Sequence, residues 1–93
     1  MKLERITALI NKAGYAYIGE GRGIGQAEGK KVECFQKKGL YSSDVIQLVI
    51  MDEKKDEILP VFSVNVPITL RDAVYAIMND HTLAAENSMQ LFN

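Results

Sequence analysis

The chain of 93 residues contains one cysteine, one histidine and no tryptophan. A single cysteine cannot form a disulfide within the chain, which indicates a reducing compartment. Catalysis by a Cys–His pair requires the two side chains to be in contact, but Cys34 and His81 fall in segments predicted to be different elements. A structural metal site usually takes four Cys or His ligands. We therefore expect no enzyme and no bound metal or other cofactor.

Long hydrophobic runs are also missing. No apolar run approaches the ~20 residues that a membrane-spanning helix needs, and residues 1–5 lack the apolar region of a secretory signal. We therefore expect a cytoplasmic protein with no membrane partner. At this length, residues 1–93 are expected to form a single domain.

The formal net charge is only −1, but the charges are unevenly distributed along the chain. Basic residues are in excess over residues 1–41, and acidic residues are in excess over residues 42–93. Such a division either marks a charged binding face or cancels when the two halves fold against each other.

Apolar residues recur at helical spacing near both ends of the chain. The first stripe predicts a helix over residues 2–13. The second predicts a helix that begins at Thr69, with Asp72 completing a capping box. A short tail helix is predicted from Leu83 to about Gln90. The apolar residues of this tail either complete the core or pair with a second copy or another partner.

Four strands are predicted between the helices, over residues 15–18, 31–37, 45–51 and 57–66. The nearly continuous apolar run 45–51 is typical of a central strand. Pro60 lacks an amide donor and places the fourth strand at an edge, or gives it a bulge. That strand is expected to carry Ile58, Phe62, Val64 and Val66 on one face.

Short connections favour an antiparallel meander. The predicted fold is therefore α+β: an N-terminal helix, a four-stranded antiparallel meander, and a C-terminal helix (plus the short tail helix) packed on one face of the sheet.

Five of the seven glycines lie within residues 19–29, and four of them alternate from Gly19 to Gly25. In an extended segment this alternation leaves one face as bare backbone, which permits close approach of a ligand, a partner or a packed helix. Tyr15 and Tyr17 share a face that is expected to continue into these glycines. The same residues also suit a flexible hairpin tip.

The glycine stretch fails both standard phosphate motifs. A dinucleotide fingerprint needs a third glycine five positions after the first, but Ile24, Gln26 and Glu28 stand there. The phosphate-loop pattern fails at Gly29, because no glycine lies five positions before it and no Ser or Thr follows the lysine. A looser anion-binding nest of backbone amides, helped by Arg22, Lys30 and Lys31, remains an alternative.

Residues 14–18 followed by 21–26 resemble the second strand and nucleotide-binding loop of the nitrogen-regulatory PII signalling proteins, and residues 45–59 resemble their third strand and second-helix start. The resemblance covers less than half of the chain and implies a small-ligand sensor that binds an anion or nucleotide. The sequence departs from that family in three ways. No strand precedes the first helix, Pro60 interrupts the second helix, and the clearest helical stripe lies where the family ends in a strand.

An aromatic and basic sheet face that stacks single-stranded bases is a further alternative. Its members are Tyr15, Tyr17, Phe35, Lys30, Lys31, Lys37 and Lys38. Two tyrosines on one strand face more often pack under a helix, and lysine pairs at strand ends are usually solvated. We therefore do not expect nucleic acid as the partner.

The glycine hairpin and the apolar tail are the segments least typical of a hydrophobic core. Both are therefore candidates for contact with a partner. In layout, from Leu3 to Gly21 and from Gln47 to Asn79, the chain is similar to small phage-encoded inhibitors of host defence such as anti-CRISPR proteins. We expect a non-catalytic protein that binds and blocks a larger host protein or protein complex, with homodimerisation through the tail as a second contact. The expected partner-binding residues are Glu20, Arg22, Ile24, Gln26, Glu28, Lys30 and Lys31.

Overall fold

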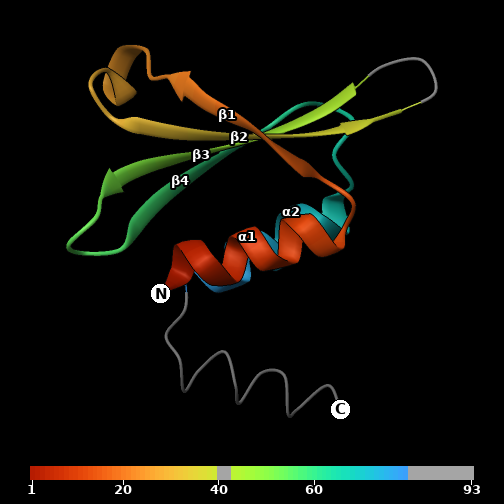
Figure 1. Ribbon diagram of the computed structural model, residues 1–93. Coiled ribbons are helices and arrows are strands. Elements are labelled where there is room, and N and C mark those ends of the chain that lie inside the picture. Colours follow the sequence, from red (N-terminus) through yellow and green to blue (C-terminus); the bar gives the residue numbers. More distant parts are fainter. Residues whose placement is uncertain (40–42, 80–93) are drawn as a thin grey trace, which may run out of the picture.

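Residues 1–39 and 43–79 fold into two α-helices and one four-stranded sheet (Figure 1). The computed structural model describes residues 1–39 and 43–79. In chain order the elements are α1 (Lys2–Lys12), β1 (Ala16–Arg22), the 3₁₀ turn η1 (Gly25–Ala27), β2 (Lys31–Lys38), β3 (Ser43–Asp52), β4 (Glu57–Phe62) and α2 (Ile68–Met78). The α+β prediction is confirmed. The predicted tail helix and His81 lie outside the described residues.

The sheet is an antiparallel meander, in which each strand pairs with the one before it in the order β1-β2-β3-β4. The continuous apolar run predicted as a central strand is β3, which lies between β2 and β4. The strand that contains Pro60 is at an edge, as the missing amide donor predicted.

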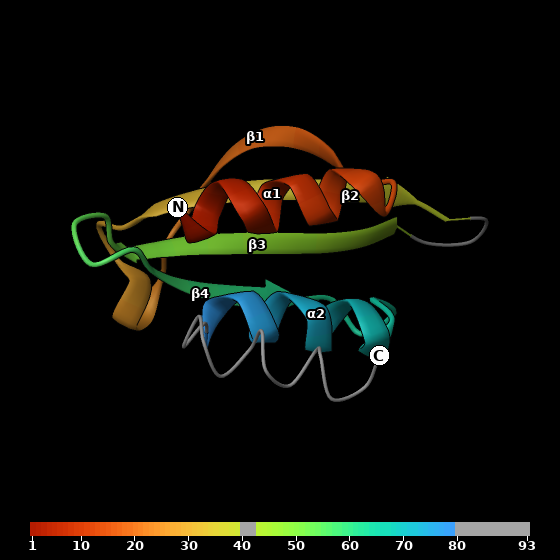
Figure 2. The same cartoon turned by 90° about the horizontal axis from the view of Figure 1, so that it is seen from below.

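Both helices cover the same face of the sheet and run antiparallel to each other (Figure 2). The core lies between the two layers. Ile6 and Ile10 of α1 and Val74 of α2 are fully buried against the fully buried Ile46 and Leu48 of β3. No helix in the described ranges is long and apolar enough to cross a membrane.

The opposite side of the sheet, called the open face below, has no α-helix over it in the described part of the chain. Because side chains alternate along paired strands, register assigns residues to this face. Its main members are Gly19, Gly21, Val32, Cys34, Gln47, Val49, Leu59 and Val61. A second, smaller apolar cluster of Val32, Cys34 and Val49 lies here, with Ala27 of η1 packed against it. The thiol of Cys34 is buried in this cluster.

The expectation that the tyrosine face continues into the glycines is wrong. Tyr17 pairs with Phe35 on the helix-covered face, and their rings meet edge to face with centroids 5.5 Å apart. The register then shifts between Tyr17 and Gly19, so that Ile18 is an extra residue in β1. Such a bulge moves the residues that follow to the other face of the sheet. The bare backbone therefore lies on the open face, opposite Cys34 and Val32.

The fourth strand is shorter than predicted, because it ends at Phe62 instead of Val66. The Ser63 hydroxyl accepts a 2.9 Å hydrogen bond from the Val45 amide in place of a backbone carbonyl. The guanidinium of Arg71 donates to the carbonyl oxygens of residues 63, 64 and 66 and holds them in a turn. Val64 is consequently 90% exposed and does not share the buried face of Phe62.

The predicted capping box at the start of α2 does not form. The helix begins at Ile68, one residue before Thr69, and its N-cap is Pro67, which has no side-chain acceptor. The proline ring already restricts φ to about −65°, which matches its position directly before the helix. Thr69 is therefore inside the first turn, where it cannot act as the N-cap.

Candidate protein-binding surface

The segment between β1 and β2 folds back over the open face of the sheet. Residues 25–27 form η1, and Ala27 packs on the small cluster that contains Val32 and Val49. Three amides are used inside the segment: Ala27 donates to Ile24, Glu28 to Gly25, and Lys30 to Ala27. The glycine stretch is therefore a folded loop with its own hydrogen bonds.

Two glycines permit this close approach. A Cβ atom on Gly21 would lie 2.7 Å from the Sγ atom of Cys34, closer than real Cβ atoms come to a neighbour. A Cβ atom on Gly23 would clash with the carbonyl oxygen of Ala27. The bare face of the glycine stretch thus contacts the protein's own strand β2 and its own η1 turn.

Two of the seven predicted partner-binding residues belong to a separate cluster on the helix-covered side. The Lys31 ammonium lies 3.3 Å from a Glu33 carboxylate oxygen and 3.7 Å from one of Glu20. Hydrogen bonding to Glu33, followed by the charges of Glu33 and Glu20, raises the pKa of Lys31. Hydrogen bonding to the same Glu33 carboxylate is also the largest cause that raises the pKa of Tyr17 to about 12.

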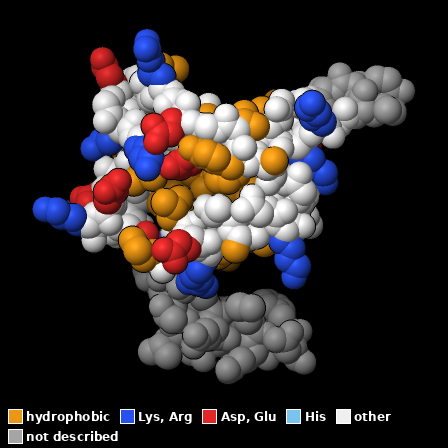
Figure 3. Space-filling model, in the orientation of Figure 1, with side chains coloured by type: hydrophobic (Ala, Val, Ile, Leu, Met, Phe, Trp, Pro, Cys, Tyr) orange, Lys and Arg blue, Asp and Glu red, His pale blue; other side chains and the backbone are white. Residues whose placement is uncertain are grey.

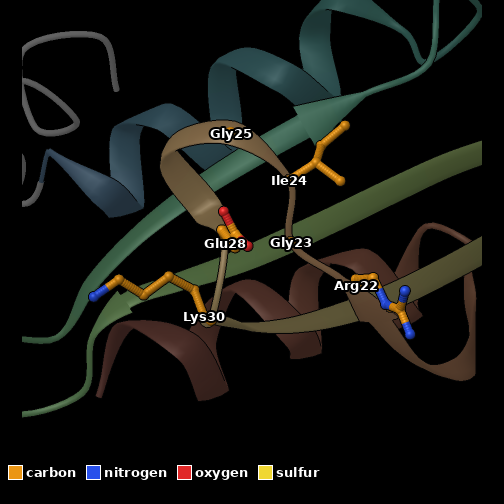
Figure 4. A pocket seen from close by; sticks show the side chains of 8 residues that line it. Arg22, Gly23, Ile24, Gly25, Glu28 and Lys30 are labelled. Carbon is orange, nitrogen blue, oxygen red and sulfur yellow. The ribbon is translucent and has the colours of Figure 1, made fainter.

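The other five predicted residues, Arg22, Ile24, Gln26, Glu28 and Lys30, surround the loop. A depression of about 770 Å³ opens inside the loop and is lined by four of them and by glycine backbone (Figure 4). The side chains of Arg22 and Lys30 point away from each other, and the acidic Glu28 lies on the same rim. This depression does not gather positive charge around one point, as an anion cradle would.

A second depression crosses the open face from the loop to the edge strand β4, and we call it the loop–β4 groove. It has a volume of about 350 Å³. Its walls are Arg22, Gly23, Ile24, Gln26 and Ala27 from the loop, Val32, Gln47 and Val49 from the middle strands, and Leu59 and Val61 from β4. Ile24 is 80% exposed, and Leu59 and Val61 are 44% and 45% exposed.

Leu59 and Val61 were not among the predicted site residues. These two residues could have been found from the alternation of side chains along β4, in which Ile58 is buried and Leu59 and Val61 are exposed. An edge strand with apolar residues on both faces leaves apolar side chains exposed on the face that the helices do not cover. From the sequence, only the residues expected on the covered face of this strand (Ile58, Phe62, Val64 and Val66) were named, and the opposite face was not considered.

The aromatic face proposed for base stacking is mostly inside the protein. Tyr15 is 3% exposed and its hydroxyl lies 3.4 Å from an Asp44 carboxylate oxygen, while Phe35 is 2% exposed. Tyr17 alone of the three is exposed. With Leu3 and Phe35 it lines a depression between α1 and the sheet. Figure 3 shows hydrophobic side chains gathered in a hollow on this side of the molecule. A stacking platform for successive bases is therefore not present among these three rings.

No family model matches the chain, and no curated protein or solved structure matches it either.

Proposed function

We propose that this is a non-catalytic interaction protein that binds a larger protein through the glycine loop and the open face of the sheet, and blocks it. The observation that carries the proposal is the exposure of Ile24, Leu59 and Val61 around one groove. Each of these side chains leaves apolar surface in water, and all three line the same groove. Burial of this apolar surface on a partner is favourable.

The loop supports the same proposal because hydrogen bonds within it hold it in one conformation. Its internal amide bonds and the close approach of Gly23 to Ala27 fix where Ile24 projects. A preorganised loop loses less conformational entropy on binding than a flexible hairpin does. The similarity in layout to small phage-encoded inhibitors suggests what is blocked. We propose that the partner is a component of host defence and that it is inhibited in the cytoplasm.

The small-ligand alternative gains no support from the loop. The amides of Ala27, Glu28 and Lys30 are directed to loop carbonyls, which leaves fewer donors for an anion. The rim combines Arg22 and Lys30 with Glu28 and does not concentrate one sign of charge.

The test is capture of binding partners from host lysate with the tagged full chain, followed by an activity assay of the purified partner. We expect the Ile24→Asp variant to lose the partner and to lose the blocking effect, because the substitution places a charge in the apolar contact. The matched control is Val64→Asp, since Val64 is 90% exposed but does not line the groove.

The proposal fails if Ile24→Asp recovers the same partner as the wild-type chain. It also fails if the partner's activity is unchanged when the wild-type protein is added in excess.

A further inference from the structure

A depression of about 230 Å³ opens on the helix-covered side of the sheet, between α1 and the paired strands β1 and β2. Leu3, Thr7 and Asn11 line it from α1, where they lie about one helical turn apart on one face of the helix. Tyr17, Glu33 and Phe35 line it from the sheet. Register places Tyr17 opposite Phe35, whose ring belongs to the core under the helices. Glu33 is two positions before Phe35 in β2 and shares its face.

The charge of this depression is negative. Among its six lining residues, which all lie in the described part of the chain, Glu33 alone is charged, and its side chain is only 15% exposed. The Lys31 ammonium, 3.3 Å from one oxygen of this carboxylate, is also 3.7 Å from Glu20, so two carboxylates share one cation. Lys31 lines a different depression, beside Met1 and Ile58. The cluster of Glu20, Glu33 and Lys31 therefore keeps an excess of negative charge.

The rest of the lining is aromatic, aliphatic or neutral. The Tyr17 ring is 52% exposed, whereas the Phe35 ring beside it is buried. Aromatic rings attract cations, and the attraction grows where water is displaced. A metal ion would need several oxygen ligands around one point, but Glu33 is the only carboxylate among the lining residues that the structure describes.

The kind of organic cation follows from the acceptors. A guanidinium carries five N–H donors and pairs best with both oxygens of a carboxylate, but one oxygen of Glu33 already contacts Lys31. A quaternary ammonium has no N–H group and needs no acceptor. Its methyl groups bury apolar surface, and its charge needs only a nearby carboxylate and an aromatic ring.

From the single carboxylate, the exposed ring and the apolar lining, we infer that this depression binds a methylated ammonium group. The methyl groups contact Leu3 and the Tyr17 ring, and the positive charge lies near the Glu33 carboxylate. Free small molecules such as choline and methylated lysine side chains of proteins both carry this group. The site lies on the opposite side of the sheet from the loop–β4 groove, so the inference goes beyond the proposed function and does not depend on it.

The experiment titrates the full chain with choline and, in parallel, with dimethylbutanol, in which a carbon atom replaces the quaternary nitrogen. The two probes have nearly the same shape and differ in charge. NMR shifts of the Leu3 and Thr7 methyl groups and of the ring-labelled Tyr17 report binding at this site. We expect choline to bind about fivefold more tightly than dimethylbutanol, which is typical of one partly exposed charge contact.

A third titration, with trimethyllysine blocked at both ends, distinguishes the two sources of the group. Tighter binding than choline would identify a protein side chain as the ligand, because the blocked residue adds peptide contacts. Weaker binding would identify a free small molecule. Either result requires the methylated ammonium to bind.

Two variants test the role of the charge. Glu33→Gln should weaken choline by about fivefold and leave dimethylbutanol unchanged. Glu20→Gln is the matched control, because it removes a carboxylate of the same cluster that does not line the depression. Its effect on choline should be smaller than that of Glu33→Gln.

Two further variants test the ring. Tyr17→Leu should weaken choline by about threefold, because the cation–π contact is lost. Tyr17→Phe keeps the ring and removes the hydroxyl, so it should bind choline as the wild-type chain does. This pair separates loss of the ring from loss of the hydroxyl and its bond to Glu33.

Three results would overturn the inference. Equal binding of choline and dimethylbutanol would mean that the depression is an apolar hollow without charge selection. Unchanged choline binding in Glu33→Gln would remove the carboxylate from the site. Tighter binding of methylguanidinium than of choline would show that the site selects a planar cation with N–H donors.

Discussion

The Asp56 carboxylate accepts a 2.7 Å hydrogen bond from the backbone amide of Lys2, which lies 54 positions earlier in the chain. Lys2 is the first residue of α1, and the first amides of a helix have no partner within the helix. Met1 occupies the N-cap position and provides no side-chain bond. The β3–β4 turn therefore caps α1 from a distance and attaches the helix to the sheet.

Asp56→Ala is expected to lower the free energy of unfolding by about 1 kcal/mol or somewhat more, the usual cost of a lost cap. Asp56 has φ of +56°, and alanine tolerates this left-handed conformation poorly. Asp56→Asn is the matched variant, because asparagine keeps an acceptor oxygen and adopts the same backbone conformation readily. Urea denaturation measures both variants. Equal destabilisation by the two would show that the negative charge matters more than the hydrogen bond.

Gly23→Ala is expected to open the glycine loop. The added Cβ would clash with the Ala27 carbonyl oxygen, so the loop must shift, at a cost typical of overpacking, about 1–3 kcal/mol. Hydrogen exchange should then accelerate at the Lys30 amide, which bonds to that carbonyl at 2.9 Å. Gln26→Ala, an exposed change in the same loop, serves as the control and should leave this exchange rate unchanged. Retained protection at Lys30 in Gly23→Ala would show that the loop can adjust without opening.

Glu33→Gln is expected to lower the pKa of Tyr17 from about 12 toward its usual value of 10.0, because hydrogen bonding to the Glu33 carboxylate is the largest cause of the shift. The raised pKa means that the folded state holds the phenolic proton more tightly than the unfolded state does. The stabilisation from Tyr17 is therefore complete below pH 10 and is lost as the pH rises toward 12. NMR titration of ring-labelled tyrosine measures the change.

Glu20→Gln is the control for this titration, since Glu20 contributes only a smaller charge effect to the pKa of Tyr17. A larger shift in Glu20→Gln than in Glu33→Gln would contradict the assignment of the main cause.

Pro60→Thr is expected to increase self-association of the protein. The substitution restores an amide donor at the free edge of β4, in the middle of a strand whose outer face carries Leu59 and Val61. Sedimentation velocity over a range of concentrations measures the effect. Val61→Thr is the control, because the amide of residue 61 already faces β3 and gives the edge no new donor. A monomeric Pro60→Thr protein at all concentrations would show that the proline does not protect the edge.

The order and type of the elements could be predicted because each depends on local pattern. The stripe that includes Ile6 and Ile10 specifies α1, and the apolar run 45–51 specifies a strand that is covered by helices on one face and partly by the loop on the other. Pro60 predicted an edge strand because proline has no N–H to donate to a second neighbouring strand. These features do not depend on distant parts of the chain.

The faces of β1 could not be predicted, since a bulge is decided by how two strands fit together. One extra residue, Ile18, moves the later residues of β1 to the other face of the sheet, and no local sequence signal marks that position. The groove was missed in part for a similar reason. Ile24 was predicted from the loop, but Leu59 and Val61 join it only because η1 folds across β2 and β3 toward β4.

The meander order has a consequence for how the protein folds. Every strand pairs with its neighbour in the chain, from residue 16 to residue 62, so no strand pairing has to wait for a distant segment. Such local pairing is associated with fast folding, because short loops close at a small entropic cost. We expect the three hairpins of the sheet, β1–β2, β2–β3 and β3–β4, to form first. Docking of α1, which needs the β3–β4 turn in place to bond Lys2, would then be the late event.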